Sequence, residues 1–415
     1  MPLQNLTTDV DVAIIGAGAA GLGAAHALLN SGLSLVVLEA RDRLGGRGHT
    51  IMAAPGIEFD VGCGWLHSAD RNSFVGIAKH LGFEIDRSHP PWGDTSFGDS
   101  FPPKERDEFA DALEEFYKRA DDAAMRKIDR PAADYLEPRN RWNPMIGAVS
   151  TYVNGAELDR ISTLDTHAYE DTGVNWRMRR GYGALIAAYG APCPVALDCN
   201  VSLIDHSGAR IRIETSRGTL SAAKVIVTVP TNLIADEAIR FHPALPAKVE
   251  AARQLPLGLA DKVMLALDEP NLLPTDGNLR VATMRTAMGS YHLRPFGLNC
   301  IEGFFGGRFA RELEDAGDGA LAAQSIDEIV AVLGNDYRRK LKPLAESRWA
   351  HDPFARGSYS HALPGHASAR AALATPVDNR LFFAGEATSP HFFSTAHGAR
   401  DSGQRAAGQT MGSKH

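Results

Sequence analysis

Three glycines near the start of the chain have the spacing of a phosphate-binding turn. Gly16, Gly18 and Gly21 follow an apolar run at residues 12–15, which is long enough for a buried parallel strand. In this G-x-G-x-x-G pattern the first glycine permits a tight turn, the second admits a pyrophosphate against the backbone, and the third lets helix and strand pack closely. Free N–H groups at the start of the following helix would face the phosphates.

The elements around these glycines complete a dinucleotide-binding unit. A helix is predicted over residues 20–31, with Ala19 and Ala20 at its start among the expected cofactor contacts. A second apolar run at residues 35–38 ends in Glu39, at the spacing where an acid hydrogen-bonds a ribose hydroxyl. The negative charge of Glu39 would repel a 2′-phosphate, so NADP is disfavoured.

A second glycine-rich stretch, which includes Arg41 and Arg47, follows directly. Ala40 and Arg41 come after the ribose acid, and Gly45, Gly46 and Arg47 follow a few residues later. The two arginines could neutralise a pyrophosphate while the glycines allow close backbone approach. The alternative is a basic turn on the protein surface.

Length and composition are those of a globular protein of two domains. The chain has 415 residues, of which 44% are hydrophobic and 22% charged, and a formal net charge of −7. This charge gives no reason to expect nucleic acid or an anionic membrane as a partner. No apolar run approaches the about 20 residues that a membrane-spanning helix needs.

Cysteines and histidines show no metal-binding pattern. The four cysteines are scattered, and the fifteen histidines form no H-x-x-x-H or comparable cluster. We therefore expect no metal, reduced thiols and, with no signal peptide evident, a cytoplasmic location.

The N-terminal motifs resemble those of one family. Gly-Ala-Gly-Ala-Ala-Gly at residues 16–21, followed by Leu-Glu-Ala-Arg-Asp-Arg-Leu-Gly-Gly-Arg at 38–47, resembles the signature of the FAD-containing amine oxidases. The resemblance implies an α/β protein with a Rossmann-type FAD-binding domain and a substrate-binding domain of mixed sheet plus helices. We expect these domains to be discontinuous, the first made of residues 1–75, 180–243 and 350–415, and the second of residues 76–179 and 244–349.

Two further segments of the expected FAD-binding domain carry site residues by this resemblance. Residues 59–67 form a strand and a glycine-rich turn in which Gly64 and Trp65 would contact the cofactor. His67 ends this segment and resembles a histidine beside flavin and substrate in polyamine oxidases, although a histidine in a polar turn is an equal alternative. Val201 matches a position whose backbone contacts the adenine, but a valine of the core would look the same.

Lys262 stands at the head of an apolar strand, where burial should disfavour its charge. Such a lysine is commonly an exposed charge at a sheet edge. In amine oxidases, however, a lysine in this context hydrogen-bonds through a water to flavin N5. The resemblance therefore makes Lys262 the main candidate for a catalytic residue.

Residues 349–360 resemble the tryptophan-to-Gly-Ser-Tyr segment of polyamine oxidases. By this resemblance Trp349 packs against the isoalloxazine ring and Tyr359 forms one wall of the amine-binding cleft. Monoamine oxidases carry a cysteine before the tyrosine that bonds the flavin covalently. Ser358 occupies that position here, so non-covalent FAD is expected.

The last motif follows a buried strand at residues 381–383. Gly385 and Glu386 would meet the ribityl or phosphate region of the flavin, and the backbone of Thr395 and Ala396 its pyrimidine edge, as the resemblance implies. Monoamine oxidases complete an aromatic cage with a tyrosine at the position of Thr395. This departure disfavours small aromatic amines.

Residues 104–124 read as a charged amphipathic helix, with an apolar stripe and acidic residues on the other faces. The acids could attract a cationic substrate, or simply form a solvated surface. Prolines at residues 131–144 indicate a loop. Strands are predicted at residues 199–204, 209–215 and 223–229.

The resemblance implies an oxidase of small-molecule amines that passes a hydride from the amine α-carbon to flavin N5. Hydrolysis of the imine would give a carbonyl compound, and dioxygen would reoxidise the flavin to give peroxide. A polyamine is the favoured substrate; the alternatives are another secondary, cyclic or monoamine, or an L-amino acid. A protein that only binds FAD is a further alternative, but it would need none of Lys262, Trp349 and Tyr359. The sequence indicates no oligomeric state.

Overall fold

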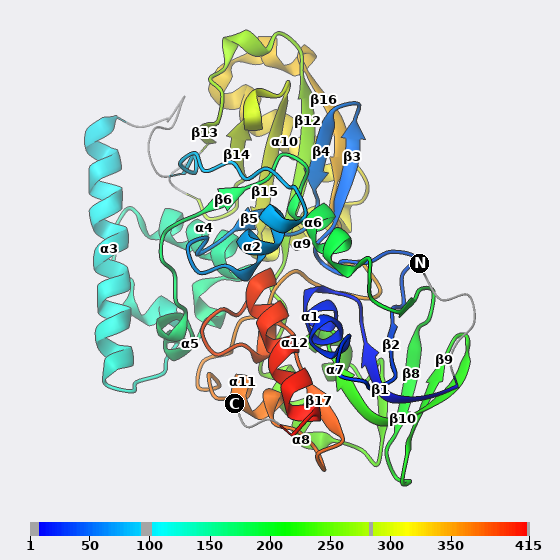
Figure 1. The fold of residues 1–415 in the computed structure, drawn as a ribbon. Helices are drawn as coiled ribbons and strands as arrows, with labels where there is room; N and C mark the ends of the chain where they lie inside the picture. Colours follow the sequence, from blue (N-terminus) through cyan, green and yellow to red (C-terminus); the bar gives the residue numbers. More distant parts are fainter. Residues whose placement is uncertain (1–7, 93–101, 282–284, 413–415) are drawn as a thin grey trace.

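The computed structural model describes residues 8–92, 102–281 and 285–412. Two large sheets organise the fold, one at the lower right of Figure 1 and one at its top. Residues 1–7 and 413–415, on which the expected cytoplasmic location partly rests, lie outside the described residues. In the described ranges no helix combines the length and apolarity required to cross a membrane.

The first sheet contains the predicted nucleotide-binding strands. Its path runs β11-β8-β9-β10-β1-β2-β7, and β17 pairs with the end of β10. Its strands are β1 (Asp9–Ile15), β2 (Leu35–Leu38), β7 (Val195–Ala196), β8 (Val201–Asp205), β9 (Ile211–Thr215), β10 (Gly218–Val227), β11 (Arg240–His242) and β17 (Leu381–Phe383). The pairs of β1 with β2 and β10, of β2 with β7 and of β10 with β17 are parallel, whereas β8, β9 and β10 form an antiparallel meander. Long apolar strands buried on both faces explain why this sheet has helices around it.

The second sheet is antiparallel throughout its described pairs and runs β13-β14-β15-β12-β16. Its strands are β12 (Ala260–Leu267), β13 (Gly277–Arg280), β14 (Ser290–Leu293), β15 (Cys300–Gly306) and β16 (Leu341–Glu346). Two small pairs connect the large sheets, namely β3 (Thr50–Ala54) with β4 (Ile57–Asp60), and β5 (Trp65–Leu66) with β6 (Trp176–Arg177).

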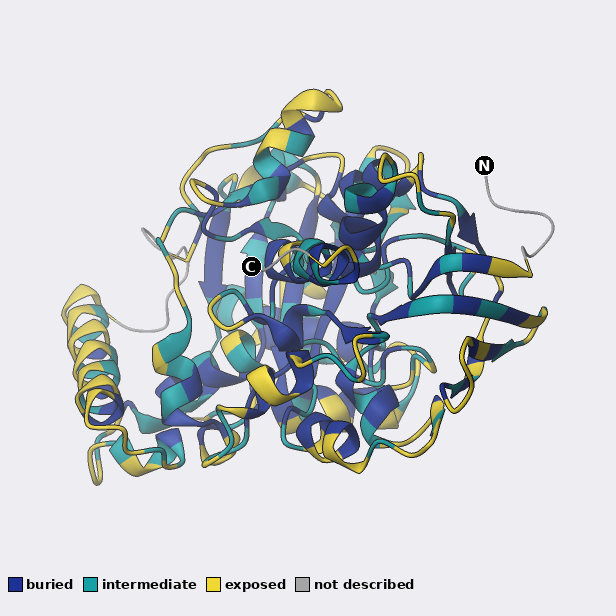
Figure 2. Ribbon diagram, turned by 60° about the horizontal axis from the view of Figure 1, so that its bottom comes forward, coloured by how far each residue is buried: buried dark blue, intermediate teal, exposed yellow. Residues whose placement is uncertain are grey.

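Helices cover both sheets and build the outer part of the molecule. They are α1 (Ala19–Leu28), α2 (Ser73–His80), α3 (Pro103–Met125), α4 (Asn143–Asn154), α5 (Thr163–Ala168), α6 (Tyr182–Gly190), α7 (Thr231–Ala235), α8 (Pro246–Arg253), α9 (Gly307–Ala316), α10 (Ala320–Leu333), α11 (Ala369–Ala374) and α12 (Ala396–Thr410). In Figure 1 the red helix α12 lies beside the blue helix α1, so an early and a late segment of the chain pack together. Figure 2 shows a buried centre, with α3 at the edge of the molecule exposing its outer face.

The observed elements confirm the predicted α/β class. The eight-stranded sheet takes strands from residues 9–38, 195–242 and 381–383, and the second sheet from residues 260–346. This division resembles the expected domain segments, whose boundaries stay a prediction. The predicted helix at 104–124 is α3, and the predicted loop at 131–144 contains a short 3₁₀ helix, Ala132–Tyr135, before α4 begins.

Some predicted boundaries are wrong by a few residues. Helix α1 ends at Leu28, short of the predicted residue 31, because the Ser31 hydroxyl and backbone N–H both bond to the carbonyl of Leu28. Strand β8 begins at Val201 instead of residue 199. The backbone N–H of Cys199 there bonds to Glu39, outside the ladder.

Candidate active site

The glycine turn joins β1 to α1 as the spacing predicts. Gly16 has φ +103°, a left-handed conformation that favours glycine. A Cβ on Gly21 would lie 1.8 Å from the carbonyl oxygen of Gly16, so only glycine fits where the helix approaches the turn. Gly18 leaves the backbone between them bare, at the start of α1. The turn can therefore receive a phosphate against N–H groups.

Glu39 lies at the end of β2 and is 3% exposed. One carboxylate oxygen accepts a hydrogen bond from the backbone N–H of Ala17 at 2.7 Å, and the other accepts one from the N–H of Arg41 at 2.9 Å. The acid thus connects the glycine turn to the basic stretch that follows β2.

Arg41 and Arg47 of that stretch are paired with carboxylates from the C-terminal part of the chain. Arg41 donates to Asp352 at 2.5 Å, and Arg47 donates to Glu386 at 2.9 Å and to the carbonyl of Ser358 at 2.7 Å. These hydrogen bonds hold both guanidinium groups in position before any anion binds, and the carboxylates partly compensate their charges.

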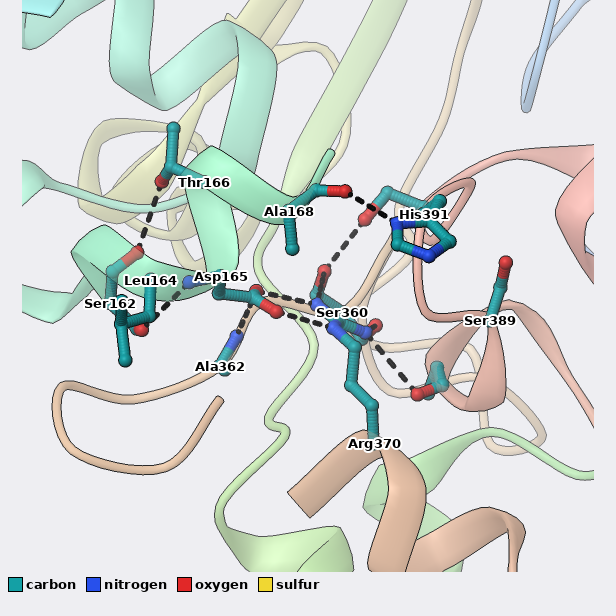
Figure 3. A network of polar contacts seen from close by, with 12 residues as sticks. Ser162, Leu164, Asp165, Thr166, Ala168, Ser360, Ala362, Arg370, Ser389 and His391 are labelled. Atoms are coloured by element: carbon teal, nitrogen blue, oxygen red, sulfur yellow. Dashed lines mark hydrogen bonds and ion pairs between the residues drawn. The ribbon is translucent and has the colours of Figure 1, made fainter. Parts of the chain in front are cut away.

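Glu386 belongs to a buried polar network that links distant segments. One of its oxygens accepts from the Ser360 hydroxyl at 2.6 Å. Figure 3 shows Arg370 of α11 reaching Ser360 on one side and Asp165 of α5 on the other. Arg370 and Asp165 form two hydrogen bonds, of 2.6 and 2.7 Å. A helix of the substrate region is thereby tied to the segment that carries Glu386.

The tryptophan and tyrosine of the 349–360 segment both lie in the cavity wall, Trp349 buried and Tyr359 half-buried. The Trp349 ring N–H donates to the carbonyl of Val61 at 2.8 Å. The Tyr359 hydroxyl donates to the carbonyl of Tyr152 at 2.5 Å, and burial raises the pKa of Tyr359. The hydroxyl of Ser358 between them donates to the carbonyl of Ala260 at 2.8 Å.

Thr395 begins the last helix. Its hydroxyl oxygen accepts from the N–H of Gly398 at 3.0 Å, which makes Thr395 the N-cap of α12, and Ala396 is the first helical residue. The hydroxyl itself donates to the carbonyl of Phe392 at 2.6 Å. The free N–H groups at the N-terminal end of α12 therefore lie at the cavity.

Lys262 is buried and not at an exposed sheet edge. Its ammonium lies 3.0 Å from a carboxylate oxygen of Glu302 and 3.1 Å from the carbonyl oxygen of Asp60. Burial alone would lower the pKa of Lys262, but the charge of Glu302 and then that of Asp60 outweigh it, so this pKa is raised. The lysine is held as an ammonium in the wall of the cavity.

His67 is fixed by an amide. Its Nδ1 lies 2.6 Å from the Asn175 side-chain oxygen, and burial lowers the pKa of His67. The imidazole is therefore neutral near pH 7, with Nδ1 donating to the amide oxygen. This geometry favours an ordered histidine in the site over one in a solvated turn.

A single cavity of about 1520 Å³ brings the predicted residues together. The predicted site residues that line this cavity are Gly16, Gly18, Ala19, Ala20, Glu39, Ala40, Arg41, Gly45, Gly46, Arg47, Gly64, Trp65, His67, Val201, Lys262, Trp349, Tyr359, Gly385, Glu386, Thr395 and Ala396. Gly21 lies behind the turn and supports it by packing. The cavity exceeds the roughly 300–1,000 Å³ of a drug-sized site and has room for a dinucleotide together with a substrate.

The chain matches the family described as flavin containing amine oxidoreductase over residues 19–150 and 156–411. The protein belongs to this family. It is an amine oxidase, and its cofactor is FAD. The predicted family is therefore confirmed.

Curated relatives and solved structures agree with this assignment. The amine oxidase is 29% identical to "Polyamine oxidase 4" of Oryza sativa subsp. japonica, over 97% of this chain and 89% of that protein. It is 27% identical to "Polyamine oxidase 2" of Arabidopsis thaliana, over 97% and 88% of the two chains. A double mutant of putrescine oxidase has the same fold, with a TM-score of 0.80 at 20% identity over 98% of this chain and all of the other. Cyclohexylamine oxidase from Brevibacterium oxydans gives a TM-score of 0.75 at 22% identity, over 96% and 98%.

Several residues that line the cavity of the amine oxidase were not predicted. They include Glu302 and His292 on neighbouring strands and Asp171 beside Ser68. A charged residue within the apolar run at residues 300–306 was a usable signal for Glu302, because an unpaired acid is costly inside a buried strand. Its partner could not be identified without the strand register.

We predict that the FAD is released intact when the protein is denatured with acid. This expectation rests on Ser358, whose hydroxyl cannot form the thioether that a cysteine forms. The hydroxyl is also hydrogen-bonded to the backbone N–H and carbonyl of Ala260. Acid precipitation should leave the yellow colour in the supernatant, with the chromatographic retention time of FAD. A yellow pellet would contradict non-covalent binding.

Proposed function

We propose that this amine oxidase acts on polyamine-type substrates. The observation that supports the proposal is the shared cavity, in which the nucleotide turn at Gly16 and the wall formed by Lys262, Trp349 and Tyr359 meet. FAD held there by the Gly16 turn, Glu39 and the stretch from Arg41 to Arg47 would supply the redox chemistry, in which a hydride leaves the amine α-carbon and dioxygen is finally reduced to peroxide. The imine product is then hydrolysed to a carbonyl compound.

The protein residues supply orientation and electrostatics. Trp349, which is buried, and Tyr359, which is half-buried, line the cavity and would confine the amine beside the flavin ring. Lys262 would hold a water at N5 with a donor that is already in place. Only an amine without its extra proton has a lone pair to support hydride loss, so the site must favour the neutral amine.

A long polycation needs contacts far from its reacting carbon. The lining of the cavity also includes the carboxylates of Asp121 on α3 and of Asp171, together with the imidazole of His67, whose pKa is lowered by burial. Remote binding of this kind can be used to position the reacting carbon. The names of the plant relatives support the same substrate class.

A small cyclic or secondary amine is the second candidate. The cavity also contains the aromatic rings of Phe109, Tyr152 and Phe304, which suit an apolar amine.

An amine panel with a peroxide readout distinguishes polyamine substrates from small cyclic or secondary amines. Turnover of spermine, spermidine or an acetylated polyamine should exceed that of benzylamine and cyclohexylamine. Faster turnover of either of the last two would contradict the polyamine assignment.

We predict that His67→Ala raises the KM for the preferred polyamine about tenfold, since one hydrogen bond to a charged group contributes about 1.5 kcal/mol or more. Steady-state rates across substrate concentrations measure this effect. His80→Ala is the matched control, because His80 is exposed on α2 and outside the cavity lining. Equal KM values for His67→Ala and the wild type would show that His67 is structural.

A further inference from the structure

Glu302 is a half-buried carboxylate on the central strand of the second sheet. On β15 it lies two residues from Phe304, the partner of Lys262 on β12, so Glu302 and Lys262 share one face and are diagonal neighbours. Their charged atoms are 3.0 Å apart, and the two side chains are only 20% and 9% exposed. Because both line the cavity, this pair faces the space in which amine and flavin must meet.

The surroundings of Glu302 favour its charged form. Burial would raise the pKa of Glu302, but Lys262 and then His292, its cross-strand neighbour on β14, outweigh this effect, and the pKa is lowered. His292 is itself 3.1 Å from Asp276, which also binds Arg177 at 2.7 Å. The ion pair of Asp276 with Arg177 therefore lies beside His292, and both His292 and Arg177 favour the charged form of Glu302.

An uncompensated ammonium in this wall would oppose the reaction. It would repel a cationic amine from the flavin, since screening by water is weak in a buried site. Without a carboxylate beside it, burial would also favour loss of the lysine proton. Asp60 would then be the remaining support of the ammonium, through its carbonyl oxygen at 3.1 Å and the smaller effect of its carboxylate.

We propose that Glu302 is a positioning residue for amine oxidation, which fixes Lys262 at the cavity wall as an ammonium and cancels its charge toward the incoming amine. The inference rests on the proposed role of Lys262 at the flavin. It adds a function for an acid that belongs to none of the motifs by which the family was recognised.

The test is a pH titration of the visible flavin spectrum of the oxidised holoenzyme, which needs no substrate. We expect the wild-type spectrum to stay constant up to the ordinary lysine pKa of about 10.4. In Glu302→Gln a transition should appear about 1–3 pH units lower, because the larger of the two opposite charges that favour the ammonium is gone and only that of Asp60 remains. The other titratable or charged groups that face the pair are those of Asp60, Cys63, His67, Arg177, His292 and Cys300.

Two further variants assign the transition to Lys262. It should disappear in the double variant Lys262→Met/Glu302→Gln, and Glu302→Asp, which keeps the charge, should move it back toward higher pH. Glu346→Gln is the matched control, since Glu346 lies on β16 at the other edge of β12 and caps α10 from outside the cavity. Its titration should equal that of the wild type.

A wild-type titration curve for Glu302→Gln, or a shift that persists without Lys262, would overturn the proposal. If Glu302→Gln does not retain FAD, the double variant Lys262→Met/Glu302→Gln tests the proposal instead. It removes both the ammonium and the carboxylate, so no charge is left unpaired, and FAD binding should be restored. Loss of FAD from the double variant as well would contradict the pairing. If no amine reduces the wild-type flavin, the proposed function fails, while the titration still tests Glu302.

Discussion

Replacing Lys262 with methionine is expected to slow reduction of the flavin by its amine substrate about 10²-fold, the usual cost of one preorganised polar contact in the transition state. FAD content should stay near that of the wild type, because the residues around the nucleotide turn are untouched. Methionine retains the bulk of the lysine stem but cannot hold a water. Stopped-flow absorbance of the anaerobic enzyme measures the rate directly.

Lys342→Met provides the matched control for this variant. Lys342 lies on β16 opposite Ala266 of β12, but it forms an exposed ion pair with Asp268 and lies outside the cavity. Its replacement should leave both half-reactions unchanged. If Lys262→Met reduces and reoxidises at wild-type rates, Lys262 has no role in the mechanism.

Arg370→Met is expected to lower the free energy of unfolding by about 3–5 kcal/mol, the cost of breaking a buried ion pair by removing one partner. Both side chains of the Arg370–Asp165 pair are 4% exposed, so water cannot replace the lost partner. Asp165 would keep a charge in the interior, and Ser360 would lose its second partner. Chemical denaturation followed by protein fluorescence and by FAD release measures the loss.

An exposed ion pair supplies the comparison for Arg370. Arg71 and Glu170 are 3.0 Å apart, with side chains 59% and 46% exposed, so Arg71→Met should have a much smaller effect. The double variant Asp165→Leu/Arg370→Met should recover most of the stability lost in Arg370→Met, since no charge is left alone. Equal losses for Arg71→Met and Arg370→Met would contradict this account of the network.

Local patterns predicted the nucleotide-binding part well. The turn at Gly16, the acid at Glu39 and the strand before them follow from short-range spacing, because each residue acts on its neighbours in the chain. Element ends were less predictable. The Ser31 side chain ends α1 early by a bond that competes with the helix, and such competition is not visible in the apolar periodicity.

The charged pairs of the site could not be predicted from the sequence, because their partners are far apart in the chain. Glu302 is forty residues from Lys262, and their contact depends on the register of β12 against β15. Asp165 and Arg370 are separated by 205 positions and meet only because α5 packs against the 360–370 segment. The resemblance identified Lys262 but carried no information about its counter-charge.

The most direct test of the account is the anaerobic mixing of the oxidised holoenzyme with spermidine, followed by its visible spectrum. We expect the flavin absorbance to bleach in a single turnover, faster than with benzylamine, and to return when dioxygen is admitted, with peroxide formed. Lys262→Met with full FAD content should bleach about 10²-fold more slowly. A wild-type flavin that stays oxidised with spermidine and all other polyamines, while benzylamine or a cyclic amine bleaches it, would contradict the account.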